Sequence, residues 1–207
     1  MSLTQLVPPA IEPITLAEAK LHARIIDSSE DSLVTLMISS ARRYAEAYCG
    51  RSFITQQWRL TLDSFPGPWG WVARNPKTFS LPSHAIQLER APVQSVQAVS
   101  YRDMGGQWQT MPGANYVLDL TGPLARIVPT FGQIWPITQP QIASVRVDFT
   151  AGYGNMATEV PEGIRQWLLI RVASLYENRE EVSAQRFTVE PLAFIDRLLD
   201  PYIVQWA

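Results

Sequence analysis

The residue types that carry most enzyme chemistry are scarce in this sequence and form no known catalytic pattern. It contains two histidines, His22 and His84, and one cysteine, Cys49. Neither histidine lies near a nucleophile-elbow motif. Cys49 ends a predicted helix beside aromatic residues, where a thiol is usually a small buried hydrophobe. The sequence patterns of zinc proteases, EF-hands and P-loops are missing. We therefore predict no catalytic residues, no metal, no cofactor and no enzyme activity.

One glycine motif could in principle bind the phosphates of a dinucleotide. Residues 152–157, Gly-Tyr-Gly-Asn-Met-Ala, match the pattern G-x-G-x-x-A and follow a predicted strand. In a dinucleotide-binding fold the helix begins inside this motif, so that its N-terminus holds the pyrophosphate. Here Thr158-Glu159-Val160-Pro161 delays the helix. We interpret the motif as a loop between a strand and a helix.

Aromatic side chains are the residues best suited to contact another molecule. Trp69 and Trp71 lie in a loop rich in proline and glycine, where they either pack into the domain or bind a partner. The chain ends Asp200-Pro201-Tyr202-Ile203-Val204-Gln205-Trp206-Ala207, which is unusually apolar for a terminus. This segment is expected to dock either onto its own core or onto another chain.

Composition and charge exclude several classes of protein. The 207 residues include 17 Lys and Arg and 19 Asp and Glu, a net charge of −2, so no basic excess favours sequence-independent binding to nucleic acid. The single cysteine predicts a reducing compartment. Without a signal peptide or an apolar stretch of about 18 residues, the chain is expected to be made in the cytoplasm and to have no membrane partner.

The predicted elements change type twice along the chain. Thr15-Leu16-Ala17-Glu18 is a capping box that predicts a short helix near 15–25. A second helix follows and ends at Gly50, with its core face expected at Leu33, Leu36, Met37, Ala41, Tyr44 and Tyr48. Residues 57–150 have alternating strands and turn signals, of which Asp103-Met104-Gly105-Gly106 predicts one hairpin and Thr121-Gly122-Pro123 a second. Helical spacing returns from Pro161 to about Asn178 and again near Pro191.

These elements predict an α+β fold with a discontinuous domain. Residues 1–56 and 151–207 are expected to form one helical core. Residues 57–150 are expected to form an antiparallel β insertion of five to seven strands. The block 51–150 has a net charge of +3, between −2 for residues 1–50 and −3 for residues 151–207.

The order of these segments resembles the head–tail connector (adaptor) proteins of tailed bacteriophages. The resemblance lies in the segments Pro13–Lys20, Asp27–Asp31, Arg43–Gln56, Thr150–Gly154, Val160–Gln166 and Tyr176–Glu180. These segments lie toward both ends of the chain, and their closest version is the prophage-encoded subgroup with a β insertion. The middle 100 residues contribute little to it.

The resemblance implies a structural subunit made in the bacterial host cytoplasm and placed at the virion head–tail junction. Such proteins form a ring with further copies of themselves beneath the portal protein, bind the next head-completion or tail protein, and let phage DNA pass without binding it specifically. On this basis the candidate subunit interface comprises Arg42, Arg43, Arg165 and Arg171. The candidate partner contacts are Trp69, Trp71, Phe194, Tyr202, Ile203 and Trp206.

A binding module for carbohydrates is the alternative function. Aromatic rings can line a groove that stacks on sugars, and the β block is rich in tryptophan. The groove would be lined by Trp58, Trp69, Trp71, Trp108 and Trp135.

Overall fold

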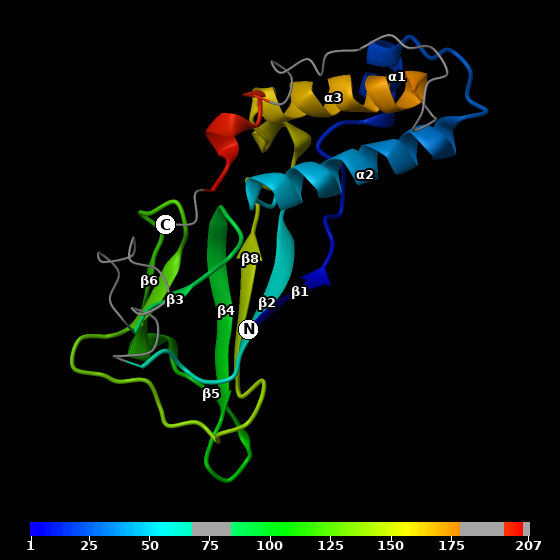
Figure 1. The fold of residues 1–207 in the computed structure, drawn as a ribbon. Helices are drawn as coiled ribbons and strands as arrows, with labels where there is room; N and C mark the ends of the chain where they lie inside the picture. Colours follow the sequence, from blue (N-terminus) through cyan, green and yellow to red (C-terminus); the bar gives the residue numbers. More distant parts are fainter. Residues whose placement is uncertain (68–83, 179–196, 205–207) are drawn as a thin grey trace, which may run out of the picture. The chain divides into compact units, whose positions relative to one another are not determined.

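The computed structural model describes residues 1–67, 84–178 and 197–204 and confirms the predicted α+β class (Figure 1). Its strands and α-helices, in chain order, are β1 (Ser2–Val7), α1 (Leu16–Ala23), α2 (Asp31–Cys49), β2 (Gln56–Leu62), β3 (Ile86–Gln87), β4 (Val93–Arg102), β5 (Trp108–Thr110), β6 (Tyr116–Asp119), β7 (Arg126–Pro129), β8 (Val145–Ala151) and α3 (Glu162–Glu177).

The chain divides into two compact units, each with its own apolar core. The sheet unit contains Met1–Pro8, Thr55–Gly152 and Val204, and the helical unit contains Pro9–Ile54 and Tyr153–Ile203. One long segment, Thr55–Gly152, leaves the helical unit and returns to it at a neighbouring point, because Ile54 forms a parallel bridge with Gly154.

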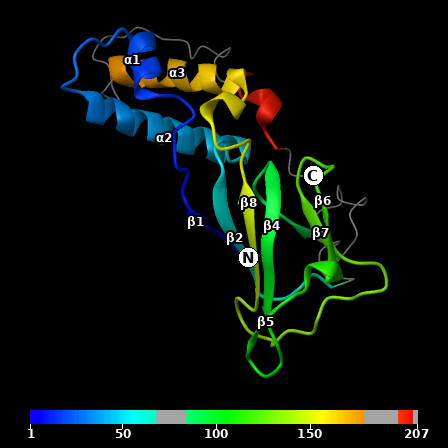
Figure 2. The same ribbon diagram turned by 180° about the vertical axis from the view of Figure 1, so that it is seen from behind.

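The sheet unit contains two antiparallel sheets. The larger has the strand order β1-β2-β8-β4-β5, and the smaller has the order β3-β7-β6 (Figures 1 and 2). Along β8 every second side chain is buried, namely Val145, Val147, Phe149 and Ala151. The opposite face is polar, and there Arg59 of β2 donates two hydrogen bonds of 2.7 Å to Asp148 of β8. The alternation therefore directs one face of the sheet into the core.

The two predicted hairpins are present. The turn at Asp103-Met104-Gly105-Gly106 joins β4 to β5, with Gly106 at a φ of 81°, a conformation that favours glycine. The turn after Asp119 joins β6 to β7, and Asp119 accepts hydrogen bonds from both the backbone and the hydroxyl of Thr121. These are local turn signals, which is why they could be read from the sequence.

The first strand corrects the predicted domain boundary. Residues 1–56 were expected to belong to the helical core, but Ser2–Val7 pairs antiparallel with β2 in the sheet unit. The side chain of Gln5 also donates to the side chain of Gln56 in that unit. The strand partner lies more than fifty residues away in the sequence, so no local pattern indicates the pairing.

The helical unit is built on three helices, with α3 packed against both α1 and α2. The capping box predicted for α1 is formed, since Thr15 Oγ1 accepts the Glu18 N–H at 3.1 Å and Glu18 Oε2 accepts the Thr15 N–H at 2.7 Å. Gly50 ends α2 at a φ of 68°, in the left-handed conformation that its type favours. The last helix predicted near Pro191 lies mostly outside the described residues, and Asp200–Tyr202 forms a single 3-10 turn.

The face that α2 turns toward the core differs from the predicted one. The buried residues are Val34, Ile38, Ala41, Arg42, Ala45, Glu46 and Cys49. Of the predicted core face only Ala41 is fully buried, whereas Leu36, Tyr44 and Tyr48 are 61%, 56% and 46% exposed. The small side chains at 41, 45 and 49 let α3 approach closely, while the larger apolar side chains point outward.

Candidate functional site

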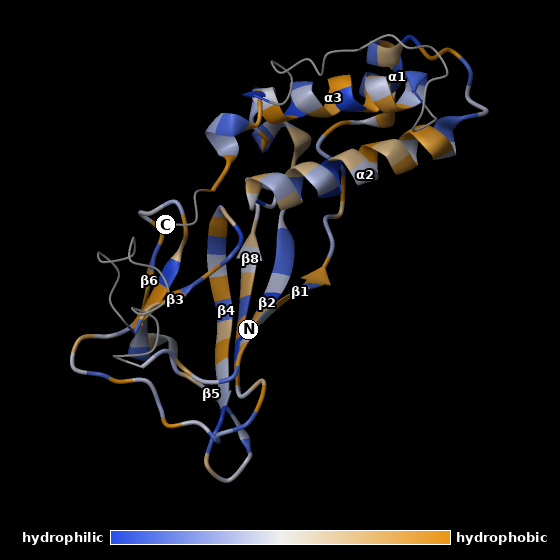
Figure 3. Cartoon of the chain, viewed as in Figure 1, coloured by the Kyte–Doolittle hydropathy of each residue, from blue (hydrophilic) through white to orange (hydrophobic). Residues whose placement is uncertain are grey.

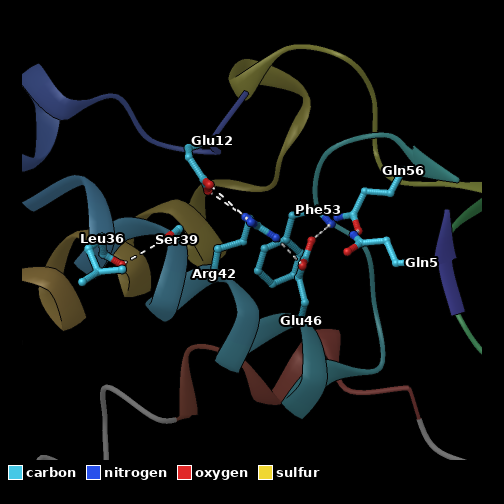
Figure 4. Close-up of polar contacts among 8 residues, drawn as sticks. All are labelled: Gln5, Glu12, Leu36, Ser39, Arg42, Glu46, Phe53 and Gln56. Atoms are coloured by element: carbon cyan, nitrogen blue, oxygen red, sulfur yellow. Dashed lines mark hydrogen bonds and ion pairs between the residues drawn. The ribbon is translucent and has the colours of Figure 1, made fainter. Parts of the chain in front are cut away.

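Arg42 is a core residue and not the interface residue that the sequence analysis predicted. It is only 5% exposed and lies between two carboxylates of the helical unit (Figure 4). Its Nε donates to Glu12 Oε2 at 2.7 Å, and its Nη1 donates to Glu46 Oε2 at 2.8 Å. Burial alone would lower the pKa of Arg42, but the hydrogen bond to Glu12 and the charge of Glu46 outweigh it and raise the pKa.

Glu46 connects this ion pair to the segment that follows α2. Its Oε1 accepts a hydrogen bond of 2.9 Å from the backbone N–H of Phe53, which is itself fully buried (Figure 4). The Arg42 cluster, defined as Arg42, Glu12 and Glu46, therefore joins the chain before α1, the middle of α2 and the exit from α2. A buried charge with both partners in place is a structural element, and its role is to fix this geometry.

The other three candidate arginines differ in whether the guanidinium group is exposed or bonded within the subunit. Arg165 of α3 donates to the carbonyl of Pro13 at 3.2 Å and pairs with Glu18, so its guanidinium is used within the subunit. Arg43 and Arg171 are exposed. The Arg171 guanidinium lies 5.9 Å from the centre of the Tyr44 ring, within the range of a cation–π contact.

Arg43 and Arg171 border an aromatic surface on the outer side of α2. The Tyr44 ring stacks on Tyr48 with centroids 6.3 Å apart and on Trp167 with centroids 6.0 Å apart. Trp167 is buried and the two tyrosines are about half exposed. This outer face of α2, comprising Leu36, Arg43, Tyr44 and Tyr48, combines aromatic and aliphatic side chains with one arginine, and the stacking of Tyr44 on buried Trp167 fixes it. It has the composition of a protein–protein contact surface.

The candidate partner contacts are only partly within the described residues. Trp69, Trp71, Phe194 and Trp206 lie outside them. Tyr202 and Ile203 are half-buried; Tyr202 packs against the helical core, and its carbonyl accepts a hydrogen bond from Arg51 Nε at 2.5 Å. The described end of the chain thus docks onto its own subunit at Tyr202, the first of the two arrangements considered from the sequence.

The structure does not support the tryptophan groove. Trp58 and Trp135 are each 9% exposed and belong to the core of the sheet unit. Trp108 is 37% exposed, and its ring is covered by the guanidinium groups of Arg102 and Arg146 at 5.1 and 4.1 Å. A sugar-stacking surface needs neighbouring exposed rings, and these three do not provide one.

The described residues also show what Cys49 does. It is fully buried, and burial raises the pKa of its thiol to about 11. Such a thiol stays protonated at neutral pH and is a poor nucleophile. In the described part of the chain, no three histidine, cysteine or carboxylate side chains are grouped as metal ligands, and no helix is both long and apolar enough to cross a membrane.

Sequence reasoning missed one exposed feature of the sheet unit. Residues 130–143, between β7 and β8, contain no charged residue and expose Phe131, Ile134, Ile137 and Ile142. The available signal was a stretch of fourteen uncharged residues in a chain of which 17% of residues are charged. We call this segment the apolar arm.

Comparison with known proteins finds one matching family model and several similar solved structures. Residues 13–102 match the model of the phage gp6-like head-tail connector protein family. Two solved structures, the neck of an empty gene transfer agent particle and the virion of the native particle, each contain a chain with a TM-score of 0.77 and 20% identity to this one. A third, the neck of the native particle, contains a chain with a TM-score of 0.68 and 22% identity. Each match covers 100% of this chain and 97% of the other.

No curated protein matches the sequence. The family match covers α1, α2 and the part of the sheet unit that ends with β4, and the structural matches extend the likeness to the rest of the chain. The resemblance drawn from the sequence is thereby confirmed: over residues 13–102 this chain is similar to the phage gp6-like head-tail connector proteins, and over its whole length it has the fold of a virion-neck chain.

Proposed function

We propose that this protein is a structural head–tail connector subunit that forms a ring in the neck of a phage-like particle. The observation that carries the proposal is the full-length match to chains of a particle neck, combined with the connector-family match at residues 13–102. The neck structures were computed with six-fold and twelve-fold symmetry, and rotational symmetry requires repeated copies of each chain.

The surface chemistry of the subunit supports a role in assembly. The outer face of α2 and the apolar arm expose large apolar side chains, which are unusual on the surface of a monomeric protein. This surface is therefore suited to binding other protein chains. In the proposed role the subunit connects the head to the tail, and its ring extends the channel through which DNA passes.

The proposed partners follow from that position. The ring lies beneath the portal protein and binds the next head-completion or tail protein on its other side. The net charge of −2 is compatible with DNA that slides through without being retained, since binding by phosphate neutralisation needs clustered Lys and Arg. The proposed site of action is the head–tail junction of a particle assembled in a bacterial host.

Deletion of the reading frame in its parent element tests the proposed function. Cells induced to make particles without this protein should release filled heads and free tails that do not join, as seen by electron microscopy. Supplying the protein from a plasmid should restore tailed particles. Normal numbers of infectious or DNA-transferring tailed particles after deletion would contradict the connector role.

A further inference from the structure

The apolar arm exposes more hydrophobic side-chain surface than any ordinary loop needs. Phe131, Ile134, Ile137 and Ile142 are 103%, 85%, 77% and 83% exposed. Figure 3 shows apolar segments along this loop between β7 and β8. Four large apolar side chains exposed to this extent within fourteen residues exceed the singly scattered hydrophobic residues of an ordinary protein surface. A partner of matching chemistry is therefore expected on the arm.

The arm is held in place along its whole course. At its start Thr130 donates its N–H to the carbonyl of Asn115 and its hydroxyl to that of Ala114. In the middle the Trp135 ring stacks on Phe65 at 4.6 Å, and its Nε1 donates to the carbonyl of His84 at 2.6 Å.

The second half of the arm is fixed by backbone contacts. Gln139 N–H donates to the carbonyl of Arg102 at 3.1 Å, and Ala143 N–H donates to Asp63 Oδ1 at 3.0 Å. The apolar side chains between these anchor points are thus presented by an ordered backbone. A preorganised surface loses little conformational entropy when it binds, which favours a specific contact.

A second copy of this chain is the occupant that the observations favour. The symmetry of the neck structures implies a closed ring, and each interface in a ring joins two different faces of neighbouring copies. The arm supplies one face. It begins next to the smaller sheet and is bonded to Arg102 at the end of β4, on the side of the larger sheet that carries β5. The other face should lie on the opposite edge of the same sheet.

That opposite edge is β1, and its chemistry matches the arm. No charged side chain occurs between Met1 and Ile11. Leu6 and Val7 are 41% and 45% exposed, and β1 has a sheet neighbour on one side only, in the part of the chain that the structure describes. Figures 1 and 2 both place β1 and the smaller sheet on opposite sides of the larger sheet. Free edge strands normally carry charges or prolines that prevent pairing, and Ser2–Val7 has neither.

We propose that in the ring the apolar arm of each subunit packs against the β1 edge of the next copy. Neither the arm nor Ser2–Val7 carries a charged side chain, so no ionised side chain has to be desolvated when the contact forms. This inference rests on the proposed connector function, because the ring supplies the second copy.

Photo-cross-linking in assembled particles tests the contact. The protein carries p-benzoylphenylalanine in place of Phe131, and particles are irradiated and digested with trypsin. A covalent dimer is expected whose cross-link joins the peptides Ile127–Arg146 and Met1–Lys20. The matched control places the same group at Leu21, which is 82% exposed in the helical unit, and should give no covalent dimer cross-linked to the peptide Met1–Lys20 of another copy.

The outcomes separate the two proposals. A cross-link to a different virion protein, a dimer joined elsewhere, or no product at Phe131 would overturn the arm contact and leave the connector role standing. Absence of the chain from purified particles would overturn both. The variant Phe131→Ser with Ile134→Ser should keep the parent melting temperature but lose ring assembly. The control Leu21→Ser with Ile26→Ser should keep both, and an arm variant that still assembles would also overturn the contact.

Discussion

Arg42 lies in the interior of the helical unit with Glu12 and Glu46, on the buried face of α2. Burying one charge without its partners would be costly, so the three side chains have to be brought together when the unit folds. The same side chain shows why a sequence pattern can mislead. An arginine on a helix is read as exposed, and its partner Glu12 lies thirty residues away.

Replacing Arg42 with methionine should destabilise the helical unit by about 3–5 kcal/mol, because Glu46 would remain buried without a counter-charge. Chemical denaturation followed by helical circular dichroism measures the change. The neighbouring exposed variant Arg43→Met is the matched control and should change the free energy of unfolding by less than about 0.5 kcal/mol. Equal effects of the two variants would show that the Arg42 cluster is not part of the stabilising core.

At the scale of elements, the sequence predicted the features that depend on adjacent residues. It did not predict the pairings between residues far apart in the chain. The capping box at Thr15, the end of α2 at Gly50 and the turn at Asp103–Gly106 each depend on a few adjacent residues, and the structure contains all three. The pairing of β1 with β2 and the burial of Arg42 depend on contacts across dozens of residues. Amphipathic spacing also assigned the wrong face to α2, because that helix has apolar residues on two sides.

The two separate cores indicate that the helical unit can fold without the sheet. The pairing of Gln56 with Ala151 places the two ends of the segment 57–150 side by side, so a Gly-Gly turn can replace it. With residues 1–8 also removed, the shortened protein should keep helical circular dichroism and a cooperative thermal transition. Its Cys49 should resist iodoacetamide at pH 8, since burial holds the thiol pKa at about 11.

The same shortened protein carrying Val34→Asp is the control for that experiment. Val34 is fully buried in the helical core, and an aspartate there should abolish the transition and expose the thiol. If the shortened protein without this change shows no cooperative transition, the helical unit depends on the sheet unit and the two do not fold separately.

At the scale of the whole molecule, the proposed function explains the exposed apolar surfaces, because other chains would cover them only after assembly. The outer face of α2 and the apolar arm are ordered from within the subunit by Trp167 and Trp135 respectively, and both present side chains to solvent. The general class of the protein was recognisable from segments near both chain ends. The surfaces that assembly would use were not recognisable, because an apolar residue type does not by itself show whether the side chain is buried or exposed.

Cryo-electron microscopy of the neck of the particle that encodes this protein tests the central claim most directly. We predict a closed ring of identical subunits between the head vertex and the tail, each with the three-helix unit and the five-stranded sheet. A neck reconstruction that contains the portal and tail proteins but no ring of this fold would contradict it.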